Sequence, residues 1–568
     1  MSDKALKTVV LVVHDPRVGR LGHKRHAETL ASESPLVHTL RRAVRVPGAH
    51  AVVVVHPPET PPEFNDADVT GGVAVHRFAH ADAAGNEATA RLTSARKWAT
   101  GSWRAGLAST TCWDELLPAA PLLAALVEHD AHAAVLVGGD WCAFDPVLAG
   151  KLLELHLSAP QAYRMTFTQS PPGLGALVMA RSILESMAKN QATFGGTLAY
   201  QPTRPAIDPI GREVNLPIAA ELRDTAQRFI FDTPEAKRRL HTVAQTLGPR
   251  FAQADAVEIA ATARAAQGPA LPDTFDTLPP EIVVELTTRR LAVGPIAPQF
   301  HADIPDVDMD SKLARCVVAQ LEGRLVTFGG LGDPTLHPDF SDLVNATHDA
   351  GAAGLHVSTD LLGDSSVDAA LIALPLDIVS VNLHADTAAT YEHLMGVDCF
   401  KEVLTRMQGL FDARSAAGRA DSRPVGLPWV IPRLIKTADN LVDLETFFNR
   451  WMQVVGHALV ERAPRGGTGD HALMPDLNPV PMDPPWIEPA PGQMKRRLHV
   501  RATGEVTLCA QDWQARASLG NLRDATLSEL WSRVSNTPLS RYSTDESPVC
   551  RHCLDWWTLR KNSVAGSA

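Results

Sequence analysis

The sequence predicts an α/β protein with two successive series of βα units and a small cysteine-bearing module near its C-terminal end. Short β-branched runs alternate with stretches of helical spacing through residues 1 to about 235. A second series of the same kind begins at Ile282. Residues 476–560 differ from both, since they are rich in Pro, Trp and polar residues and hold three of the seven cysteines.

Composition narrows the classes of protein. A chain of 568 residues is too long for one hydrophobic core, so we expect about three domains. It is 45% hydrophobic and 21% charged, as expected for a soluble globular protein. The net charge of −11 argues against nucleic acid as a partner, and no apolar stretch reaches membrane-spanning length. Seven cysteines in so long a chain indicate a reducing cytoplasm, not a disulfide framework.

The first series is expected to form a layered α/β domain over residues 1–235. Its buried parallel strands are "TVVLVV", "AHAVVVV" and "AAVLVGG", and its helices include "SPLVHTLRRAV" and "AAPLLAALVEH". Residues 236–279 are first Ala- and Gln-rich and then Pro-rich, which predicts a helical connector and a linker.

The second series is expected to form a full or partial (β/α) barrel over residues 280–475. Its strands are "IVVEL", "LVTFGG", "GLHVST", "DIVSVNL" and "VGLPWVIP", separated by helical stretches such as "DFSDLVNATHDAG". Chemistry in such barrels takes place at the carboxyl ends of the strands.

The module at 476–560 has the features of a metal site, and residues 561–568 form a tail. The turn in "VRATGEVTLC" delivers Cys509 on a return strand. Thr526 and Glu529 form a capping box that begins a helix. Cys550 and Cys553 have the C-x-x-C spacing of metal ligands, although two free surface thiols remain the alternative.

The order G-x-V-x-x-C-x-x-D-W, L-G-N and C-x-x-C resembles the SPASM/twitch module of radical SAM enzymes. The resemblance implies an auxiliary iron–sulfur cluster on Cys509, Cys550 and Cys553. The segment "PAPGQMKRRLHV" lacks the further cysteine that the family usually has there. His499 or Asp512 could complete the ligand set, or one iron could stay open; a zinc site is the other alternative.

The middle series resembles a radical SAM barrel, through "VVELTTRR", "FGGLGDPTLHP", "LHVSTDLL" and "IVSVNLHADTAATYEHLMG". The three cysteines that hold the family's cluster should then fall on Arg290, Gly294 and Ala297. These residues offer a permanent cation, no side chain and a methyl group, and none of them ligates iron. The resemblance therefore implies that reductive cleavage of S-adenosylmethionine has been lost.

Binding of S-adenosylmethionine is a separate question. The resemblance implies that Gly329, Gly330 and Gly332 let the backbone approach the methionine end of the cofactor. Asp333 stands where the family usually has Glu. The alternative is that these glycines only preserve a barrel turn.

An unusual ligand set is a further alternative, with Cys316 or His301 moving in as iron ligands. Cys316 has apolar helical spacing in "SKLARCVVAQLEG" and is expected in the core. His301 is expected to be a solvated loop residue.

The first domain carries its own resemblance. "GRLGHKRHAETLASESPLVHTLRRA" and "VLVGGDWCAFDPVLAGKLLELH" are similar to segments of nucleotidyltransferases with a glycosyltransferase-A-like (Rossmann-like) fold, above all spore-coat polysaccharide cytidylyltransferases. This implies that Arg20 and Lys24 hold nucleotide phosphates and that Asp140 holds Mg²⁺. The second metal carboxylate of the family would fall near Gly175, where the chain has no acid.

Two functions follow as hypotheses. One is an enzyme of nucleotide-sugar or cell-surface polysaccharide metabolism, with a nucleotide or nucleotide-sugar as partner and neither nucleic acid nor membrane. The other is a non-catalytic scaffold or regulatory protein built from decayed enzyme domains.

Overall fold

A computed structural model of the chain describes most of both βα series. The described residues are 6–15, 28–69, 71–81, 87–99, 103–104, 110–116, 118–190, 192–198, 212–223, 225, 227–266, 278–420, 426–463 and 497–535. They fall into two compact units, Met1–Pro272 and Asp273–Ala568, which are described separately below.

The first unit is built on a six-stranded sheet of order β3-β2-β1-β4-β6-β5. Strands β1 to β4 are parallel to one another. Strand β6 pairs with β4 in antiparallel fashion, and β5 pairs with β6 in the same way. Every residue of β1, β2 and β4 is buried, as expected for strands covered on both faces. The strands are β1 Thr8–Val13, β2 Ala51–His56, β3 Ala74–Ala79, β4 Ala133–Gly138, β5 Met165–Phe167 and β6 Leu177–Ala180.

Three helices of this unit begin at short polar side chains that cap them. Ser34, Asp145 and Thr233 each accept a hydrogen bond from a backbone N–H of the first turn, and each is followed by proline. The helices are α1 Pro35–Ala43, α2 Glu87–Lys97, α3 Ala119–Glu128, α4 Pro146–Ser158, α5 Arg181–Asn190, α6 Phe194–Leu198, α7 Ala220–Arg223, α8 Pro234–Leu247 and α9 Ala256–Ala266, with 3₁₀ turns η2 Asp66–Asp68, η4 Cys112–Glu115 and η5 Gly248–Ala252.

Helices α8 and α9 occupy the stretch expected as a helical connector. Their apolar faces, including Leu240, Val243 and Ile259, share one buried cluster with Leu30 and Cys142 of the preceding domain. These helices are therefore part of the core of the first unit.

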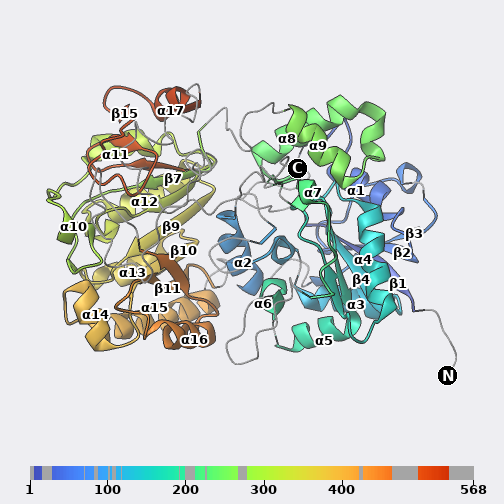
Figure 1. Cartoon of the computed structure of the whole chain (residues 1–568), viewed down its shortest axis with the longest axis horizontal. Coiled ribbons are helices and arrows are strands. Elements are labelled where there is room, and N and C mark those ends of the chain that lie inside the picture. The colour runs from blue at the N-terminus through green and yellow to red at the C-terminus, as the bar shows by residue number, and fades with distance from the viewer. Residues whose placement is uncertain are drawn as a thin grey trace, which may run out of the picture. The chain divides into compact units, whose positions relative to one another are not determined.

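The second unit contains a nine-stranded sheet of order β12-β11-β10-β9-β8-β7-β13-β14-β15. Figure 1 labels β7, β9, β10, β11 and β15 of this sheet. Strands β7 to β12 are parallel and neighbour one another in chain order, which is the succession expected for a partial barrel. The predicted α/β fold class is confirmed. The strands are β7 Glu281–Val284, β8 Leu325–Phe328, β9 Gly354–Thr359, β10 Ile378–Asn382, β11 Trp429–Lys436 and β12 Leu459–Arg462.

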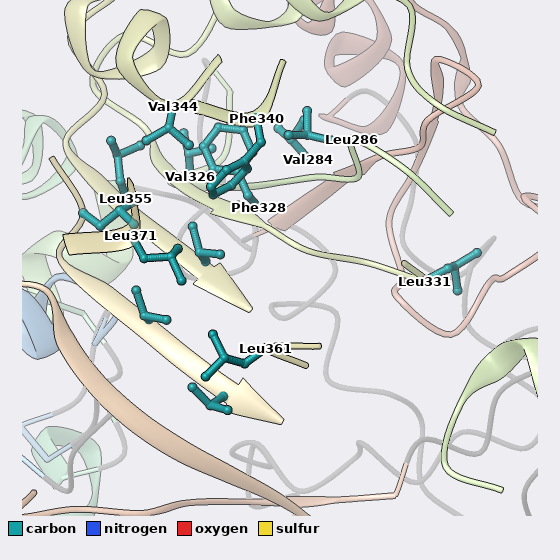
Figure 2. Packing of buried hydrophobic residues seen from close by; sticks show 14 of the residues in the cluster. Val284, Leu286, Val326, Phe328, Leu331, Phe340, Val344, Leu355, Leu361 and Leu371 are labelled. Carbon is teal, nitrogen blue, oxygen red and sulfur yellow. The ribbon is translucent and has the colours of Figure 1, made fainter. Parts of the chain in front are cut away.

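One face of these strands packs on helices. Figure 2 shows Val326, Phe328 and Leu355 against Phe340 and Val344 of α12. Because side chains alternate along a strand, the residues between them point to the opposite face. The helices are α10 Pro298–His301, α11 Ser311–Val318, α12 Phe340–Asp349, α13 Ser366–Ala373, α14 Ala388–Met395, α15 Phe400–Ala420 and α16 Leu444–Val454, with the 3₁₀ turn η6 Pro334–Leu336.

The C-terminal module extends the same sheet. β13 (Arg497–Val500) pairs in parallel with β7, and a hairpin adds β14 (Glu505–Thr507) and the short β15 (Gly520–Asn521). The predicted capping box begins α17 (Leu527–Ser535): the Thr526 N–H donates to Glu529 Oε2 over 2.7 Å, and the Glu529 N–H donates to Thr526 Oγ1 over 3.2 Å.

None of the helices within the described ranges combines the length and the apolar character needed to cross a bilayer. The longest of them, α15, carries charged side chains along its length.

Candidate functional site

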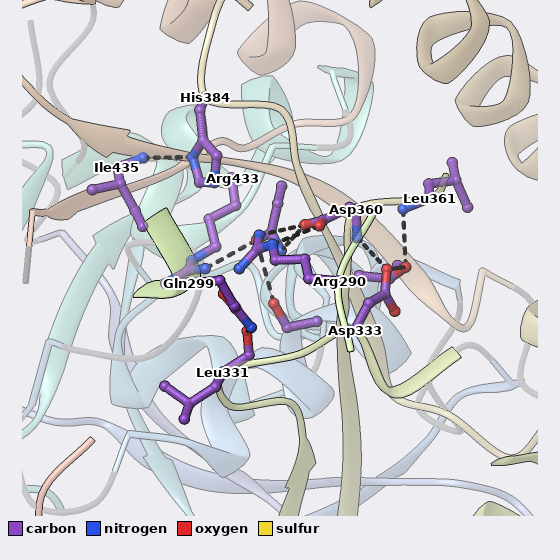
Figure 3. A network of polar contacts seen from close by, with 12 residues as sticks. Arg290, Gln299, Leu331, Asp333, Asp360, Leu361, His384, Arg433 and Ile435 are labelled. Atoms are coloured by element: carbon purple, nitrogen blue, oxygen red, sulfur yellow. Dashed lines mark hydrogen bonds and ion pairs between the residues drawn. The ribbon is translucent and has the colours of Figure 1, made fainter. Parts of the chain in front are cut away.

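Arg290 lies at the carboxyl edge of the barrel strands and forms an ion pair across it. Its Nε and Nη2 donate to the two carboxylate oxygens of Asp360 over 2.7 and 2.5 Å. Asp360 directly follows β9, so the pair joins the loop after β7 to the end of β9 (Figure 3). The side chains are only 9% and 2% exposed, so both charges are withdrawn from water.

The ion pair continues into a polar network on the next three strands. Asn382, the last residue of β10, donates through Nδ2 to Asp360 Oδ1 over 2.8 Å. Its own Oδ1 accepts from Arg433 Nη1 over 2.9 Å. Arg433 in turn donates through Nε to Glu461 over 2.6 Å. Polar groups at the ends of β9 to β12 are thus satisfied by one another.

The other two positions expected for cluster cysteines are filled by packing. A Cβ at Gly294 would lie 2.3 Å from the carbonyl oxygen of Leu394 and 2.5 Å from the backbone nitrogen of Gly396. The loop is also joined to α14 by the Ile296 N–H, which donates to the Leu394 carbonyl. Ala297 is fully buried.

A thiolate-held cluster does not fit these residues. Iron–sulfur clusters need thiolate ligands, and the three positions present a guanidinium paired with a carboxylate, a backbone contact that leaves no space for a side chain, and a buried methyl group. The chain's own side chains occupy the place where such a cluster would have to be bound.

Close packing requires glycine at two positions of the glycine-rich turn after β8. A Cβ at Gly332 would lie 2.3 Å from the Thr287 carbonyl oxygen, and one at Gly330 would lie 2.6 Å from the Glu285 carboxylate. Gly330 also has a φ of +133°, which side chains rarely adopt. A Cβ at Gly329 would make only ordinary contacts, the nearest at 3.4 Å. Packing against the loop after β7 therefore accounts for Gly330 and Gly332 without a ligand.

Asp333 is committed to holding the same loop. Its Oδ1 accepts from the Thr335 N–H and hydroxyl, and its Oδ2 accepts from the Thr359 hydroxyl and the Asp360 N–H over 2.8 Å each. Burial, and then the neighbouring Asp360 carboxylate, raise the pKa of Asp333. The structure brings Asp333 to the barrel edge as expected and gives its carboxylate a positioning role.

Glu285 connects the barrel edge to the C-terminal hairpin. Its Oε2 accepts from the Leu331 N–H over 2.8 Å and from Arg501 over 3.3 Å, and its Oε1 accepts from the Ala502 N–H over 3.2 Å. Arg501 also donates to the Asp512 carbonyl over 2.8 Å. The turn that follows Cys509 is therefore fixed relative to the barrel.

Only one of the three predicted cysteine ligands lies within the described residues. Cys509 is half-buried after β14, and its sulfur accepts a hydrogen bond from the Gln511 N–H over 3.4 Å. A ligating thiolate is stabilised by such a contact. Cys550 and Cys553 lie outside the described residues.

The two side chains considered as completing ligands differ in availability. Asp512 is buried, and its carboxylate oxygens accept from the Arg516 and Ala517 N–H groups over 2.9 and 2.8 Å. These carboxylate oxygens are therefore engaged in hydrogen bonds within the turn. His499 lies on β13 opposite Thr507, and burial followed by the charges of Arg497 and Arg501 holds its pKa well below the usual range. His499 is therefore neutral, the form in which imidazole binds metals.

The expectation for Cys316 was wrong, because it is exposed on α11. The helix buries Leu313, Ala314, Val317 and Val318, and position 316 falls on the opposite side of the helical wheel. His301 is half-buried in α10, and its Nε2 donates to the Pro295 carbonyl over 2.6 Å.

In the first unit, Asp140 follows β4 at the carboxyl edge of the sheet and is 2% exposed. β4 and β2 lie on opposite sides of β1, so this is where the strand order changes direction, the usual place for a nucleotide in open α/β sheets. Arg20 and Lys24, the predicted phosphate ligands, lie outside the described residues.

A second buried acid whose backbone lies close to Asp140 was not predicted from the sequence. The Phe231 N–H donates to the Asp140 carbonyl over 2.9 Å, which brings the following residue, Asp232, to the same edge. Asp232 is buried, and both of its oxygens accept from Arg228, over 2.9 and 2.5 Å. Its signal in the sequence is the run "RFIFD", in which an acid ends an apolar stretch just as Asp140 does.

The arginine that holds Asp232 belongs to a buried group of four charges. Arg228 also donates to Glu115, which accepts from Arg96 Nε over 2.8 Å. Two cations and two anions thus neutralise one another between η4, α2 and the segment before α8.

Gly175, where a second metal carboxylate was expected from the resemblance, has no room for one. A Cβ there would lie 1.9 Å from the Ser170 hydroxyl oxygen. Among the described residues, no group of three or more His, Cys, Asp or Glu side chains is arranged to hold a metal ion. Mg²⁺ in such a site would have to rely on Asp140, Asp232 and the phosphates of a nucleotide.

Comparison with known families bears on the C-terminal part of the chain. Residues 492–554 match the SPASM family model, an iron–sulfur cluster-binding domain. The match covers Cys509, Cys550 and Cys553 and confirms the predicted resemblance of this module.

Comparisons with individual proteins give more distant likenesses. The chain is 22% identical over 305 residues to an uncharacterized protein of Treponema pallidum (strain Nichols), covering 50% of this chain and 80% of that protein. Among solved structures it is similar to BtrN in complex with AdoMet (15% identity, 50% of this chain and 95% of that one, TM-score 0.31). It is also similar to a cytidylyltransferase from Leptospira borgpetersenii (14%, 47% and 100%, 0.31) and to Streptococcus suis SuiB bound to the precursor peptide SuiA (11%, 49% and 70%, 0.32).

Proposed function

We propose that the chain is a cytoplasmic radical SAM-derived protein of nucleotide-sugar or cell-surface polysaccharide metabolism. In this proposal its first unit binds a nucleotide or nucleotide-sugar with Mg²⁺. The observation that supports it most directly is the hydrogen bond from the Phe231 N–H to the Asp140 carbonyl, which brings the backbone of Asp232 close to that of Asp140 at the point where the sheet order reverses.

The residues have distinct parts in this binding. Asp140 and Asp232 would each offer carboxylate oxygens to Mg²⁺, which prefers one or two carboxylates together with substrate phosphates. Arg20 and Lys24 would hold the phosphates as fixed cations. Since both oxygens of Asp232 are bonded to Arg228, nucleotide binding would have to loosen that pair or use Asp140 alone.

The C-terminal module would hold an iron–sulfur cluster on Cys509, Cys550 and Cys553, with His499 as a neutral fourth ligand or one iron left open. The family match supports a cluster over zinc at this module. Such a cluster supplies electron transfer or structural stabilisation, and here it would also anchor the hairpin that Glu285 and Arg501 tie to the barrel.

The barrel itself would perform no reductive cleavage of S-adenosylmethionine. The support is the donor set at its edge: the Arg290–Asp360 pair, the backbone contacts of Gly294 and the buried methyl of Ala297.

The nucleotide proposal is tested by calorimetric titration of the full chain with CTP, UTP, GTP and ATP in the presence of Mg²⁺. We expect millimolar or tighter binding by one of them, abolished by Asp140→Asn and weakened by Asp232→Asn. Asp66→Asn, at a carboxylate that is 73% exposed in the same unit, is the matched control and should bind as the parent does. Absence of binding by all four nucleotides contradicts the proposal.

The iron–sulfur proposal is tested by iron and sulfide analysis of anaerobically purified protein. Cys509→Ser should lower both, whereas Cys316→Ser, at an exposed cysteine of the same unit, should leave both unchanged. Equal iron in the two variants contradicts the ligand assignment.

A non-catalytic scaffold is the second candidate, and one observation favours it. The carboxylates at both sheet edges, Asp232 and Asp360, are each held by an arginine of the chain itself. If neither nucleotide nor iron is bound, the scaffold is the better description.

A further inference from the structure

The inward face of the barrel strands carries rows of hydrogen-bonding side chains at matching register. In the deeper row, Thr327 of β8, His356 of β9 and Ser380 of β10 are linked: Thr327 Oγ1 lies 3.3 Å from His356 Nδ1, and His356 Nε2 lies 2.8 Å from Ser380 Oγ. Two residues nearer the carboxyl edge, the Ser358 hydroxyl donates to Asn382 Oδ1 over 3.3 Å. These residues alternate with the apolar side chains that pack on the helices, so they face the barrel interior.

Part of this face is open to solvent. Thr327, His356, Ser358 and Arg433 are half-buried, in contrast to the fully buried apolar residues beside them. Polar side chains with no accessible surface could only stabilise the fold. The half-buried side chains of this face still present hydroxyl, imidazole and guanidinium groups to a ligand.

The charges of the described inward face are balanced within the chain. Four arginines are matched by four carboxylates: Arg290 by Asp360, Arg433 by Glu461, Arg497 by Glu281, and Arg501 by Glu285. Burial, and then the charge of Arg433, lower the pKa of His356 to about 3, so this imidazole is neutral at physiological pH. Asp333, at the same edge, is buried and enclosed by hydrogen bonds from Thr335, Thr359 and the Asp360 N–H. To gain a counter-charge from the four arginines and their carboxylates, a charged ligand would have to break one of these pairs.

We propose that the inward face of the barrel around Thr327, His356 and Ser358 binds a neutral, polyhydroxylated ligand, of the sugar or cyclitol class. Hydroxyl groups of such a ligand both donate and accept hydrogen bonds, as Ser, Thr, Asn and neutral His side chains do. The paired arginines and carboxylates add further donors and acceptors at the rim without demanding a charge on the ligand. The site is independent of nucleotide binding by the first unit.

Saturation-transfer NMR of the full chain tests this, with glucose, galactose, N-acetylglucosamine and myo-inositol as neutral probes and glucose 6-phosphate and S-adenosylmethionine as charged ones. We expect transfer to at least one neutral probe and weaker transfer to the charged ones. Thr327→Val with Ser358→Ala removes two hydroxyls and should weaken the affinity by about fivefold or more. Thr405→Val, at an exposed threonine of α15, is the matched control and should leave it unchanged.

The proposal is overturned by no transfer to any neutral probe, by transfer to a charged probe in preference to the neutral ones, or by equal transfer in the parent and the double variant. Asp140→Asn separates this site from the proposed nucleotide site. Sugar transfer that persists in Asp140→Asn belongs to the barrel, and transfer lost in it belongs to the first unit and also overturns the proposal. Circular dichroism of each variant verifies that the chain is folded.

Discussion

Removing one partner of the buried ion pair between Arg290 and Asp360 should destabilise the barrel edge, because it leaves an uncompensated buried charge. Replacing Arg290 by Met keeps the length of the side chain and removes its charge. Asp360 is then left as a buried carboxylate, 2% exposed, with the Asn382 amide as its remaining side-chain donor. Removing one partner of a buried ion pair costs about 3–5 kcal/mol, and we expect the lower end because of that remaining donor.

A cycle of variants separates the pair from the cost of each substitution. Arg290→Met and Asp360→Asn should each destabilise the barrel, while the double variant buries no unpaired charge. The loss of stability in the double variant should therefore be smaller than the sum of the two single losses, by about 2 kcal/mol or more. Arg250→Met, in an ion pair whose arginine is 71% exposed, is the surface control and should cost about 1 kcal/mol or less.

Hydrogen exchange is the suitable assay, because the chain contains two units and need not unfold in one step. The amides of β9 and β10 report on the barrel edge directly. A loss of about 3 kcal/mol corresponds to exchange faster by roughly a hundredfold in Arg290→Met. Two results would refute this reasoning about the ion pair. One is a change in exchange rate of less than about fivefold in Arg290→Met. The other is a loss of stability in the double variant equal to the sum of the two single losses.

Three further predictions concern the positions of the family's cluster cysteines, the glycine-rich turn and His356. A variant with cysteine in place of Arg290, Gly294 and Ala297 should bind no more iron than the parent chain, because a side chain at position 294 would lie 2.3 Å from a backbone oxygen. Metal analysis after reconstitution measures this, and a gain of about four irons contradicts it. Gly332→Ala should lower the free energy of urea unfolding by about 2 kcal/mol or more, because its Cβ would lie 2.3 Å from a carbonyl oxygen. Gly329→Ala should change it by less than about 1 kcal/mol. Equal effects of the two substitutions would contradict the packing argument. The pKa of His356 is lowered to about 3 by burial, so its stabilising contribution is full above its unfolded pKa near 6.5 and falls as the pH drops from there towards 3, by about 1.4 kcal/mol per pH unit. His356→Gln should flatten the pH dependence of stability between pH 7 and 5 by about 2 kcal/mol, and an unchanged slope in that variant is the contrary outcome.

The fold was predictable because its signals are local. Runs such as "TVVLVV" and "AAVLVGG" are buried strands, and the capping box of Thr526 and Glu529 begins a helix where expected. The identity of the residues at the cluster positions was also plain from the sequence. What each contributes was not, since Arg290 pairs with a residue 70 positions away and Gly294 packs against the end of α14.

The two misjudged residues show the limits of pattern reasoning in physical terms. Cys316 lies among apolar residues in the sequence, but the turn of the helix carries it to the exposed side. Asp232 was overlooked because it lies far from Asp140 along the chain, and only the hydrogen bond of Phe231 across the sheet edge brings the two together. Long-range contacts of this kind leave no local signal.

The barrel edge is held together by side chains of the protein, and we infer that the cluster that cleaves S-adenosylmethionine does not bind there. The most direct measurement is the yield of 5′-deoxyadenosine when the chain, reconstituted with iron and sulfide, is reduced with dithionite in the presence of S-adenosylmethionine. We predict a yield no higher than that of a protein-free control, whether or not the C-terminal module holds iron. Formation of 5′-deoxyadenosine by the unmodified chain above that background would contradict the account and require iron ligands other than Arg290, Gly294 and Ala297 at the barrel edge.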